Sequence, residues 1–143
     1  MEFNLALNQA VANREFDKII ELVPYAQFLG MKAVNLGDEQ VFVLPNNEQH
    51  MGNPLLPAIH GGAIAGFLEM SSILQLLLTT NSQSIPKIIN FSIDYLRPGY
   101  ARDTFAYCSL TKQGRNVANV SCIAWQGNRK QPIATSRAHF LME

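Results

Sequence analysis

The chain has 143 residues, of which 48% are hydrophobic and 15% are charged, and its formal net charge is zero. This size and composition fit one globular domain with a core of its own. No arginine run and no alternation of aromatic with basic residues occurs, which excludes the usual nucleic-acid-binding modules, and we expect no nucleic-acid partner.

The charges are distributed unevenly. Residues 1–86 contain three basic and eight acidic residues, a balance of −5, whereas residues 87–143 contain eight basic and three acidic residues, a balance of +5. The positive charges are either scattered over solvated surface or gathered in a basic rim that meets a phosphorylated ligand. The sequence leaves both interpretations open.

The first predicted element is an amphipathic helix over residues 4–23, because apolar residues recur there near helical spacing. No apolar segment of signal-peptide type occurs in residues 1–20, so we expect a cytoplasmic protein. Pro24 marks the end of this helix, and Gly30 predicts a turn. A short strand over residues 40–44 follows, and residues 45–59 are rich in Asn, Pro and Gly and predict a loop.

The next predicted element is a long helix that ends near residues 81–84. Eleven of the sixteen residues from 63 to 78 are apolar, which is typical of a helix buried nearly all round. Glu69, Gln75 and two serines argue against a membrane span, so we expect no membrane partner. Glu69 is the one formally charged residue between Glu48 and Lys87. A buried carboxylate is unfavourable unless it is paired, hydrogen-bonded or protonated, which makes Glu69 a candidate functional residue.

The remaining segments predict strands. Apolar and polar residues alternate over residues 89–95, and three further strands are predicted over 104–111, 117–126 and 133–141, with turns at 113–115 and 127–129. Short connections indicate an antiparallel meander. The fold class is therefore α+β, with a long central helix against an antiparallel sheet of about five strands, in a single domain over residues 1–143. Cys108 and Cys122 lie in these strands without metal-ligand spacing, which favours two buried free thiols over a disulfide or a metal site.

Three motifs carry a family resemblance. They are Gly52-Asn53-Pro54 through His60-Gly61-Gly62, then Glu69, then Asp94-Tyr95-Leu96-Arg97-Pro98, with weaker matches at Gly114-Arg115 and Ala134-Thr135. Together with the order of elements, they resemble the hotdog-fold acyl-CoA thioesterases of the phenylacetic-acid-pathway and 4-hydroxybenzoyl-CoA type. The resemblance runs from about residue 24 to residue 141. It implies a hotdog fold, hydrolysis of an aromatic or medium/long-chain acyl-CoA, and no cofactor beyond the coenzyme A of the substrate.

The resemblance also implies site residues. The backbone N–H of Gly61 or Gly62 would stabilise the oxyanion, since two glycines at a helix start let a ligand approach unsatisfied N–H groups. Glu69 would act as a general base on water or attack the carbonyl carbon itself, and the sequence does not separate these routes. His60 would take part directly or be structural.

Further candidate residues would assist Glu69 or bind the negatively charged phosphates of coenzyme A. Asn53 would orient the water or the carboxylate, but it lies seven residues before His60 rather than six, so Asn47 is a possible substitute. Ser72, three residues after Glu69, is a candidate donor that keeps the carboxylate ionised. Three basic residues are candidates for the coenzyme A phosphates, with solvated surface charge as the other interpretation: Arg97, Lys112 and Arg115.

The spacing of the motif predicts two chains. The nine residues from His60 to Glu69 span about 13.5 Å along one helix and place the two residues half a turn apart. A single helix cannot bring both onto one thioester carbon, whereas a symmetric partner can. We therefore predict a homodimer with two shared sites, with a dimer of dimers (a homotetramer) also possible.

Two other functions stay open. A non-catalytic acyl-CoA binding module would keep the fold and the basic rim but would not need Glu69. A hotdog hydratase or dehydratase is the nearest rival enzyme, because residues 52–57 resemble its Gly-x-Pro-x-x-Pro loop. In that family, however, the helix carboxylate would fall at Ala63.

Overall fold

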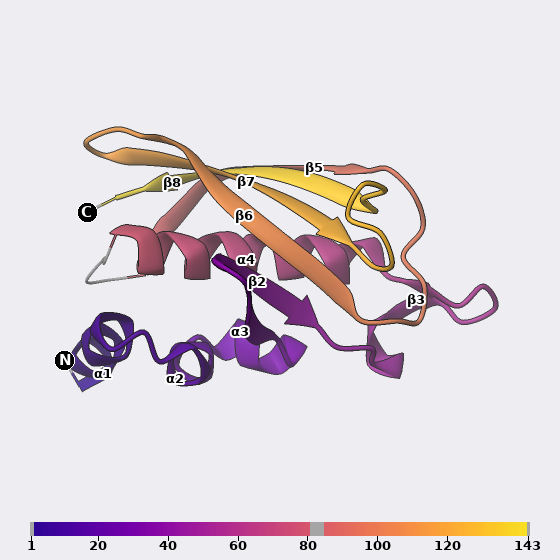
Figure 1. The fold of residues 1–143 in the computed structure, drawn as a ribbon, viewed down its shortest axis with the longest axis horizontal. Coiled ribbons are helices and arrows are strands. Elements are labelled where there is room, and N and C mark those ends of the chain that lie inside the picture. Colours follow the sequence, from indigo (N-terminus) through magenta and orange to yellow (C-terminus); the bar gives the residue numbers. More distant parts are fainter. Residues whose placement is uncertain (1, 81–84, 143) are drawn as a thin grey trace.

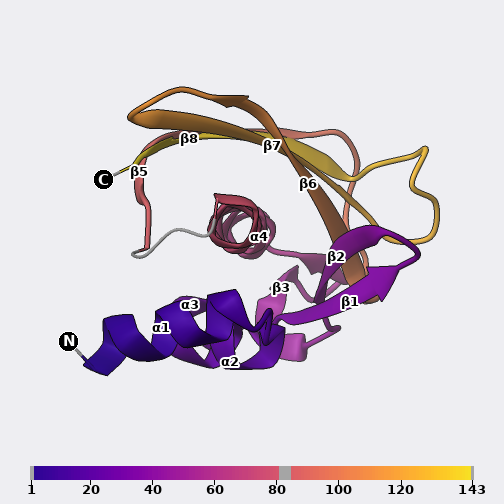
Figure 2. The ribbon, with the colours of Figure 1, turned by 60° about the vertical axis from the view of Figure 1, so that its left-hand side comes forward.

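The computed structural model describes residues 2–80 and 85–142, and its elements form three layers (Figure 1). A six-stranded sheet curves over one side of the central helix α4 (Gly61–Thr80). The other side of α4 faces three short helices, α1 (Glu2–Ala12), α2 (Phe16–Leu22) and α3 (Pro24–Leu29), as Figure 2 shows. The predicted α+β class and the long helix packed on an antiparallel sheet are confirmed. The predicted helix end near residues 81–84 lies outside the described residues.

The sheet has the strand order β1-β2-β6-β7-β8-β5, and all neighbouring strands are antiparallel. Its strands are β1 (Lys32–Leu36), β2 (Glu39–Leu44), β5 (Lys87–Tyr95), β6 (Thr104–Gln113), β7 (Val117–Trp125) and β8 (Ala134–Leu141). Five of them match the predicted strands, and β1 is the additional one. β1 is an edge strand with mostly exposed residues, so it lacks the alternation that identifies a half-buried strand.

The N-terminal region is the first difference from expectation, because two helices, α1 and α2, replace the single helix predicted over residues 4–23, and α3 follows as an additional helix. Arg14 adopts a left-handed conformation with φ 52° and ends α1. Its N–H donates to the Val11 carbonyl, and the Glu15 N–H donates to the Ala10 carbonyl, which is the Schellman pattern of a helix end. Pro24 is the first residue of α3 as well as the stop of α2, a position that suits its fixed φ.

The predicted loop over residues 45–59 contains the short 3-10 turn Glu48–His50 and a small hairpin of β3 (Met51–Asn53) and β4 (Ala58–Ile59). The hairpin is tied to the start of α4, since the His60 N–H donates to the His50 carbonyl at 2.8 Å. It is also tied to the β5–β6 loop, because the Ile59 N–H donates to the Gly99 carbonyl at 2.8 Å. These bonds fix the position of the segment that precedes α4.

The core forms where α4 fills the concave side of the sheet. By length and composition α4 is the one described helix that resembles a membrane span, and 61% of its apolar window is buried inside the fold. Small residues on the inner faces of β6, β7 and β8 let the helix approach closely, among them Ala106, Ala118, Ala124, Ala134 and Ala138. The apolar character of α4 is therefore explained by its burial between the sheet and the N-terminal helices.

The cysteines are a second difference, because Cys108 and Cys122 form a disulfide rather than two free thiols. The register of β6 and β7 places the two residues directly opposite each other, with Cα atoms 4.1 Å apart. Both side chains are buried on the face of the sheet that covers α4. Their spacing in the sequence carries no such information, since the pairing depends on the register of the two strands.

Candidate active site

The start of α4 is capped by the residue that precedes it. The His60 imidazole Nδ1 accepts a hydrogen bond from the Gly62 N–H at 2.8 Å, and the His60 carbonyl accepts from the N–H groups of Ala63 at 2.9 Å and Ile64 at 3.2 Å. A helix leaves the N–H groups of its cap residue and of the next three residues without an i−4 partner, and here those of His60, Gly62 and Ala63 are satisfied. The fourth, the Gly61 N–H, has no acceptor among the described residues.

The other side of this helix start is held by Tyr95, the last residue of β5. Its hydroxyl donates to the Gly61 carbonyl at 2.7 Å, and a Cβ on Gly61 would lie 3.2 Å from its ring. From the sequence, Tyr95 is a candidate for lining an acyl pocket or for core packing, and a contact with the start of α4 is not predicted. In the structure, Tyr95 fixes the peptide group next to the free Gly61 N–H.

Glu69 lies eight residues after Gly61 on the same continuous helix, about 12 Å along its axis. Its side chain is half-buried and makes no hydrogen bond or ion pair with any described residue. Burial away from water raises the pKa of the Glu69 carboxyl above its ordinary value. The structure therefore places an unpartnered carboxyl and an unpartnered backbone donor on one helix, too far apart to act together within one chain.

Ser72 does not serve as the expected donor to Glu69. It is fully buried, its hydroxyl donates to the Leu68 carbonyl at 2.8 Å, and its oxygen lies 3.2 Å from the Cys122 sulfur. A serine that bonds back to the preceding turn has its proton committed. Ser72 therefore faces the sheet, away from open space, and the structure places it neither at the carboxylate nor where a substrate could reach it.

The two candidate asparagines occupy turns of the 45–59 segment. The Asn53 side-chain oxygen accepts from the Leu55 N–H at 3.0 Å, and the Asn47 oxygen accepts from the Gln49 N–H at 2.9 Å. Both are exposed. Within one chain, neither is brought to Glu69.

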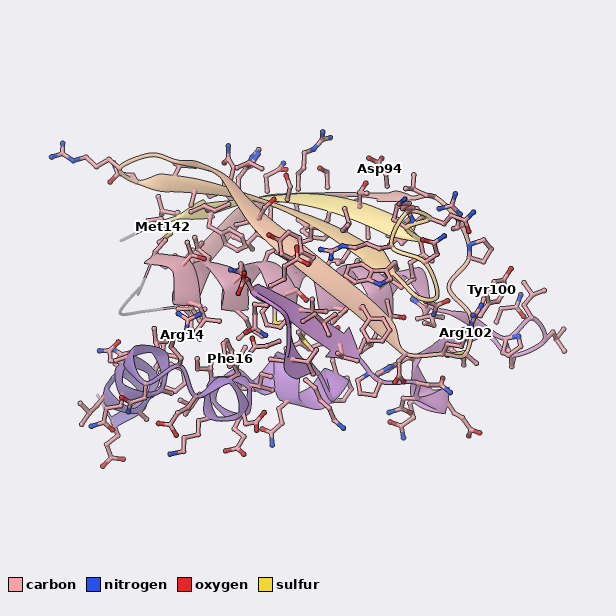
Figure 3. All side chains as sticks on the ribbon, viewed as in Figure 1. Arg14, Phe16, Asp94, Tyr100, Arg102 and Met142 are labelled. Carbon is pink, nitrogen blue, oxygen red and sulfur yellow. A yellow bond between two sulfur atoms is a disulfide. The ribbon has the colours of Figure 1, made fainter. Side chains whose placement is uncertain are left out.

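Two arginines line a hollow between the β5–β6 and β7–β8 loops, at the same end of the sheet as the start of α4. Arg97 donates to the Pro132 carbonyl, and the Arg102 guanidinium lies 5.7 Å from the centre of the Tyr100 ring (Figure 3). Gln126 ties the loops together, since its amide accepts from the Tyr100 N–H and donates to the Tyr100 carbonyl, both at 2.9 Å. Arg102 is a basic residue of this hollow that the sequence did not single out.

The structure does not bring the other two basic candidates to this hollow. Arg115 lies in the turn between β6 and β7, at the opposite end of the sheet (Figure 1). The Lys112 side chain lies outside the described part of the structure. Of the three predicted phosphate contacts, only Arg97 is placed near the start of α4.

Comparison with known proteins decides the family. The sequence profile of the thioesterase superfamily matches residues 56–133, which is more than half of the chain and includes all of α4. The chain belongs to the thioesterase superfamily. It is thus a thioester hydrolase by family, and the expected resemblance is confirmed. No curated protein matches the chain.

Solved structures agree with this membership of the thioesterase superfamily. A protein from Chromobacterium violaceum is 37% identical with a TM-score of 0.78, and the match covers 100% of this chain and 98% of that one. A phenylacetic acid degradation-related protein from Ralstonia eutropha is 20% identical with a TM-score of 0.73, over 83% of this chain and 89% of that one. A Bacillus halodurans protein solved with CoA is 19% identical with a TM-score of 0.73, over 82% of this chain and 77% of that one. The last two show a shared fold.

Proposed function

We propose that this thioesterase hydrolyses acyl-CoA thioesters at two equivalent sites of a homodimer, each made from the start of α4 in one chain and Glu69 of the other. The observation that carries the proposal is the pair of unsatisfied groups on α4. The Gly61 N–H and the Glu69 carboxyl have no partners among the described residues, and the helix holds them about 12 Å apart. In a dimer, the Gly61 N–H of one α4 and the Glu69 carboxyl of the other α4 can act on the same thioester.

Gly61 is the proposed oxyanion donor. His60 occupies the Gly62 N–H, so the choice between the two glycines falls on Gly61. A free N–H at the positive end of a helix stabilises the negative charge that develops on a thioester oxygen during attack. In this proposal His60 acts by shaping the helix start, and Gly62 leaves room for its imidazole, because a Cβ there would lie 2.9 Å from Nδ1.

Glu69 is the proposed general base. It takes a proton from water as the water oxygen bonds to the thioester carbon, and the carbonyl electrons move onto the oxygen that faces Gly61. When this intermediate collapses, the C–S bond breaks and the coenzyme A thiolate takes the proton from Glu69, which leaves a carboxylic acid and a thiol. In the other route the carboxylate attacks the carbon, expels the thiolate and forms a mixed anhydride, which water then hydrolyses.

The edge strand β5 is the proposed dimer contact. Among the described strands β5 pairs only with β8, so its other edge has no strand partner over residues 88–95, and Ile88 and Ile89 are 39% and 57% exposed. A long edge with exposed apolar side chains is a template for pairing with another strand. A twofold pairing of β5 with its copy reverses one α4 relative to the other, so that the start of each helix faces the interior of its partner.

The hollow at Arg97 and Arg102 is the proposed contact for the coenzyme A phosphates. It lies at the same end of the molecule as Gly61, and arginine binds phosphate oxygens through two N–H groups at once. Asp103, the acidic neighbour, has one carboxylate oxygen accepting from the Asn46 N–H at 2.8 Å. Asn53 or Asn47 of the 45–59 segment would orient the water.

The test is the hydrolysis of a panel of aromatic and straight-chain acyl-CoA substrates, measured by the release of free thiol. We expect turnover by the native protein and a loss of at least about a thousandfold in Glu69→Gln, since the amide can neither take a proton nor attack. The variant should keep its dimer mass and its binding of acyl-CoA. Unchanged turnover in Glu69→Gln, or turnover by a stable monomer, would contradict the proposal, and binding without turnover by the native protein would favour the acyl-CoA binding module.

A further inference from the structure

Tyr25 of α3 lies directly on the backbone of α4, one turn before Glu69. A Cβ on Gly66 would lie 2.8 Å from the Tyr25 hydroxyl oxygen and 2.9 Å from a carbon of its ring. The phenol therefore occupies the space that a side chain at position 66 would take. Gly66 precedes Glu69 by three residues, so the two positions lie on the same face of the helix.

This face is the part of α4 that the rest of the fold leaves open. In the first half of the helix, four residues on it are exposed or half-exposed, namely Gly62, Ala65, Gly66 and Glu69. Tyr25 is the side chain that α3 places against this strip. The phenol and Glu69 therefore share this strip of the helix.

The Tyr25 hydroxyl is free to act as a donor. It makes no hydrogen bond with any described residue, while its ring stacks on Phe28 with centroids 6.0 Å apart. Pro24 at the first position of α3 and the left-handed Gly30 at its end fix the short helix that carries the ring. The Phe28 ring and the short helix α3 thus position the phenol, and its O–H has no acceptor among the described residues.

Glu69 needs such a donor. Both catalytic routes use an ionised carboxylate, burial disfavours ionisation, and the serine expected to help is bonded elsewhere. Cβ atoms three residues apart on a helix are about 5–6 Å apart, and helical side chains lean toward the N-terminus. A change of Glu69 rotamer therefore brings its carboxylate within hydrogen-bond reach of a phenol oxygen that lies against Gly66.

We propose that Tyr25 is a positioning residue whose hydroxyl donates to the Glu69 carboxylate, holding it ionised and aimed at the thioester. This inference rests on the proposed role of Glu69 and adds a contribution from the N-terminal helices. The hydrogen bond is not made in the chain as described, and it forms when Glu69 turns toward Gly66. The absence of a side chain at Gly66 leaves the space that the phenol occupies.

Few other titratable groups face this part of α4. Tyr95 and His60 are bonded at the helix start, the inner faces of β6 to β8 present the disulfide, and Lys87 lies at the opposite end of β5 from Tyr95. The charged residues of α2, which packs on the later turns of α4, are exposed: Asp17, Lys18 and Glu21. His50 is buried beside the helix start, where its carbonyl accepts from the His60 N–H, so it lies by His60 rather than by Gly66. Tyr25 is the described uncommitted donor that contacts the turn before Glu69.

The first experiment measures kcat against pH for the native protein and Tyr25→Phe. We expect the acid limb to move up by about one pH unit and kcat below that limb to fall about tenfold, with KM changed less than about twofold. Tyr107→Phe is the matched control, because it removes a hydroxyl from the outer face of the sheet beneath Arg129. Gly66→Ala should reproduce the Tyr25→Phe profile, because the added Cβ displaces the phenol. The substitution should not weaken the helix, since alanine is a better helix former than glycine.

The second experiment measures the pKa of Glu69 by NMR on glutamate labelled at the carboxyl carbon, with Glu69→Gln to assign the signal. We expect a higher pKa in Tyr25→Phe than in the native dimer and no change in Tyr107→Phe. Superimposable profiles and equal Glu69 pKa values in the native protein and Tyr25→Phe would overturn the inference. If no acyl-CoA is hydrolysed at all, the proposed function fails, and the NMR titration still decides whether Tyr25 and Glu69 are coupled.

Discussion

The Tyr95 hydroxyl donates a 2.7 Å hydrogen bond to the Gly61 carbonyl and so joins the end of strand β5 to the first residue of α4. The carbonyl belongs to the residue whose N–H is free for an oxyanion. The free N–H lies in the preceding peptide group, so through this bond the sheet contributes to the orientation of the proposed donor, together with the hydrogen bonds of His60.

Tyr95→Phe should therefore reduce activity more than stability. Removing one exposed neutral hydrogen bond costs about 1 kcal/mol or less of unfolding free energy, whereas a misaligned oxyanion donor costs about tenfold or more in kcat. Steady-state kinetics and urea unfolding of the same preparation measure the two effects. A kcat equal to that of the native protein would show that the Gly61 peptide group is positioned without Tyr95.

His60 is expected to act as a helix cap. His60→Ala removes the acceptor of the Gly62 N–H and should cost about 1 kcal/mol of unfolding free energy, whereas His60→Asn offers another acceptor at the same position and should keep most of the stability. Denaturant unfolding compares the two variants, and their kcat values decide the role in catalysis. An equal loss of activity in both, with stability kept in His60→Asn, would assign the imidazole a direct part in the reaction.

The buried carboxyl makes stability depend on pH. Because burial raises the pKa of Glu69 in the folded chain above its unfolded value near 4.5, the folded state favours the protonated form. The native protein should thus lose stability relative to Glu69→Gln as the pH rises above about 4.5 through the folded pKa, and the difference should vanish at lower pH. Solvent screens the half-exposed group, so the effect should stay below about 1 kcal/mol. Melting curves from pH 4 to 8 test this, and a constant offset between the two proteins would contradict it.

The disulfide predicts a redox-dependent stability. In the chain-entropy account, closing a loop of about 14 residues contributes about 3 kcal/mol, so reduction or Cys108→Ala/Cys122→Ala should lower the midpoint of urea unfolding. Titration of free thiols in denaturant without reductant gives the direct check. Two reactive thiols per chain would support the expectation drawn from the sequence and contradict the bond.

Two helix ends show how far the sequence could predict the fold. Both Gly30 and Arg14 end a helix in the left-handed conformation, with φ 74° and 52°. The turn at Gly30 was predicted because glycine adopts this conformation without strain. The break at Arg14 was missed because arginine gives no such signal, and the periodic apolar residues run on across it.

The candidate site also contains residues that the sequence identifies and contacts that it does not predict. Glu69 was identified because it is a single charge in an apolar helix, and the two glycines were identified through the family resemblance. The side chains around Glu69 were not predicted correctly. Ser72 lies three residues after Glu69, yet it faces the sheet. Tyr25, which contacts Gly66, lies 41 residues before it in the chain, so no local pattern links the two. Which side of α4 the N-terminal helices leave open is decided by tertiary packing.

The most direct test of the shared site is a heterodimer of two inactive chains. One chain carries Glu69→Gln and the other Gly61→Pro, which removes the backbone N–H at a helix position where proline is tolerated. The two chains are co-expressed with different tags, the mixed dimer is isolated by both tags, and acyl-CoA hydrolysis is measured. If each site combines Gly61 of one chain with Glu69 of the other, the mixed dimer holds one intact site and should show about half the native turnover per dimer. A mixed dimer as inactive as its two parents would place both groups of each site in one chain and contradict the account.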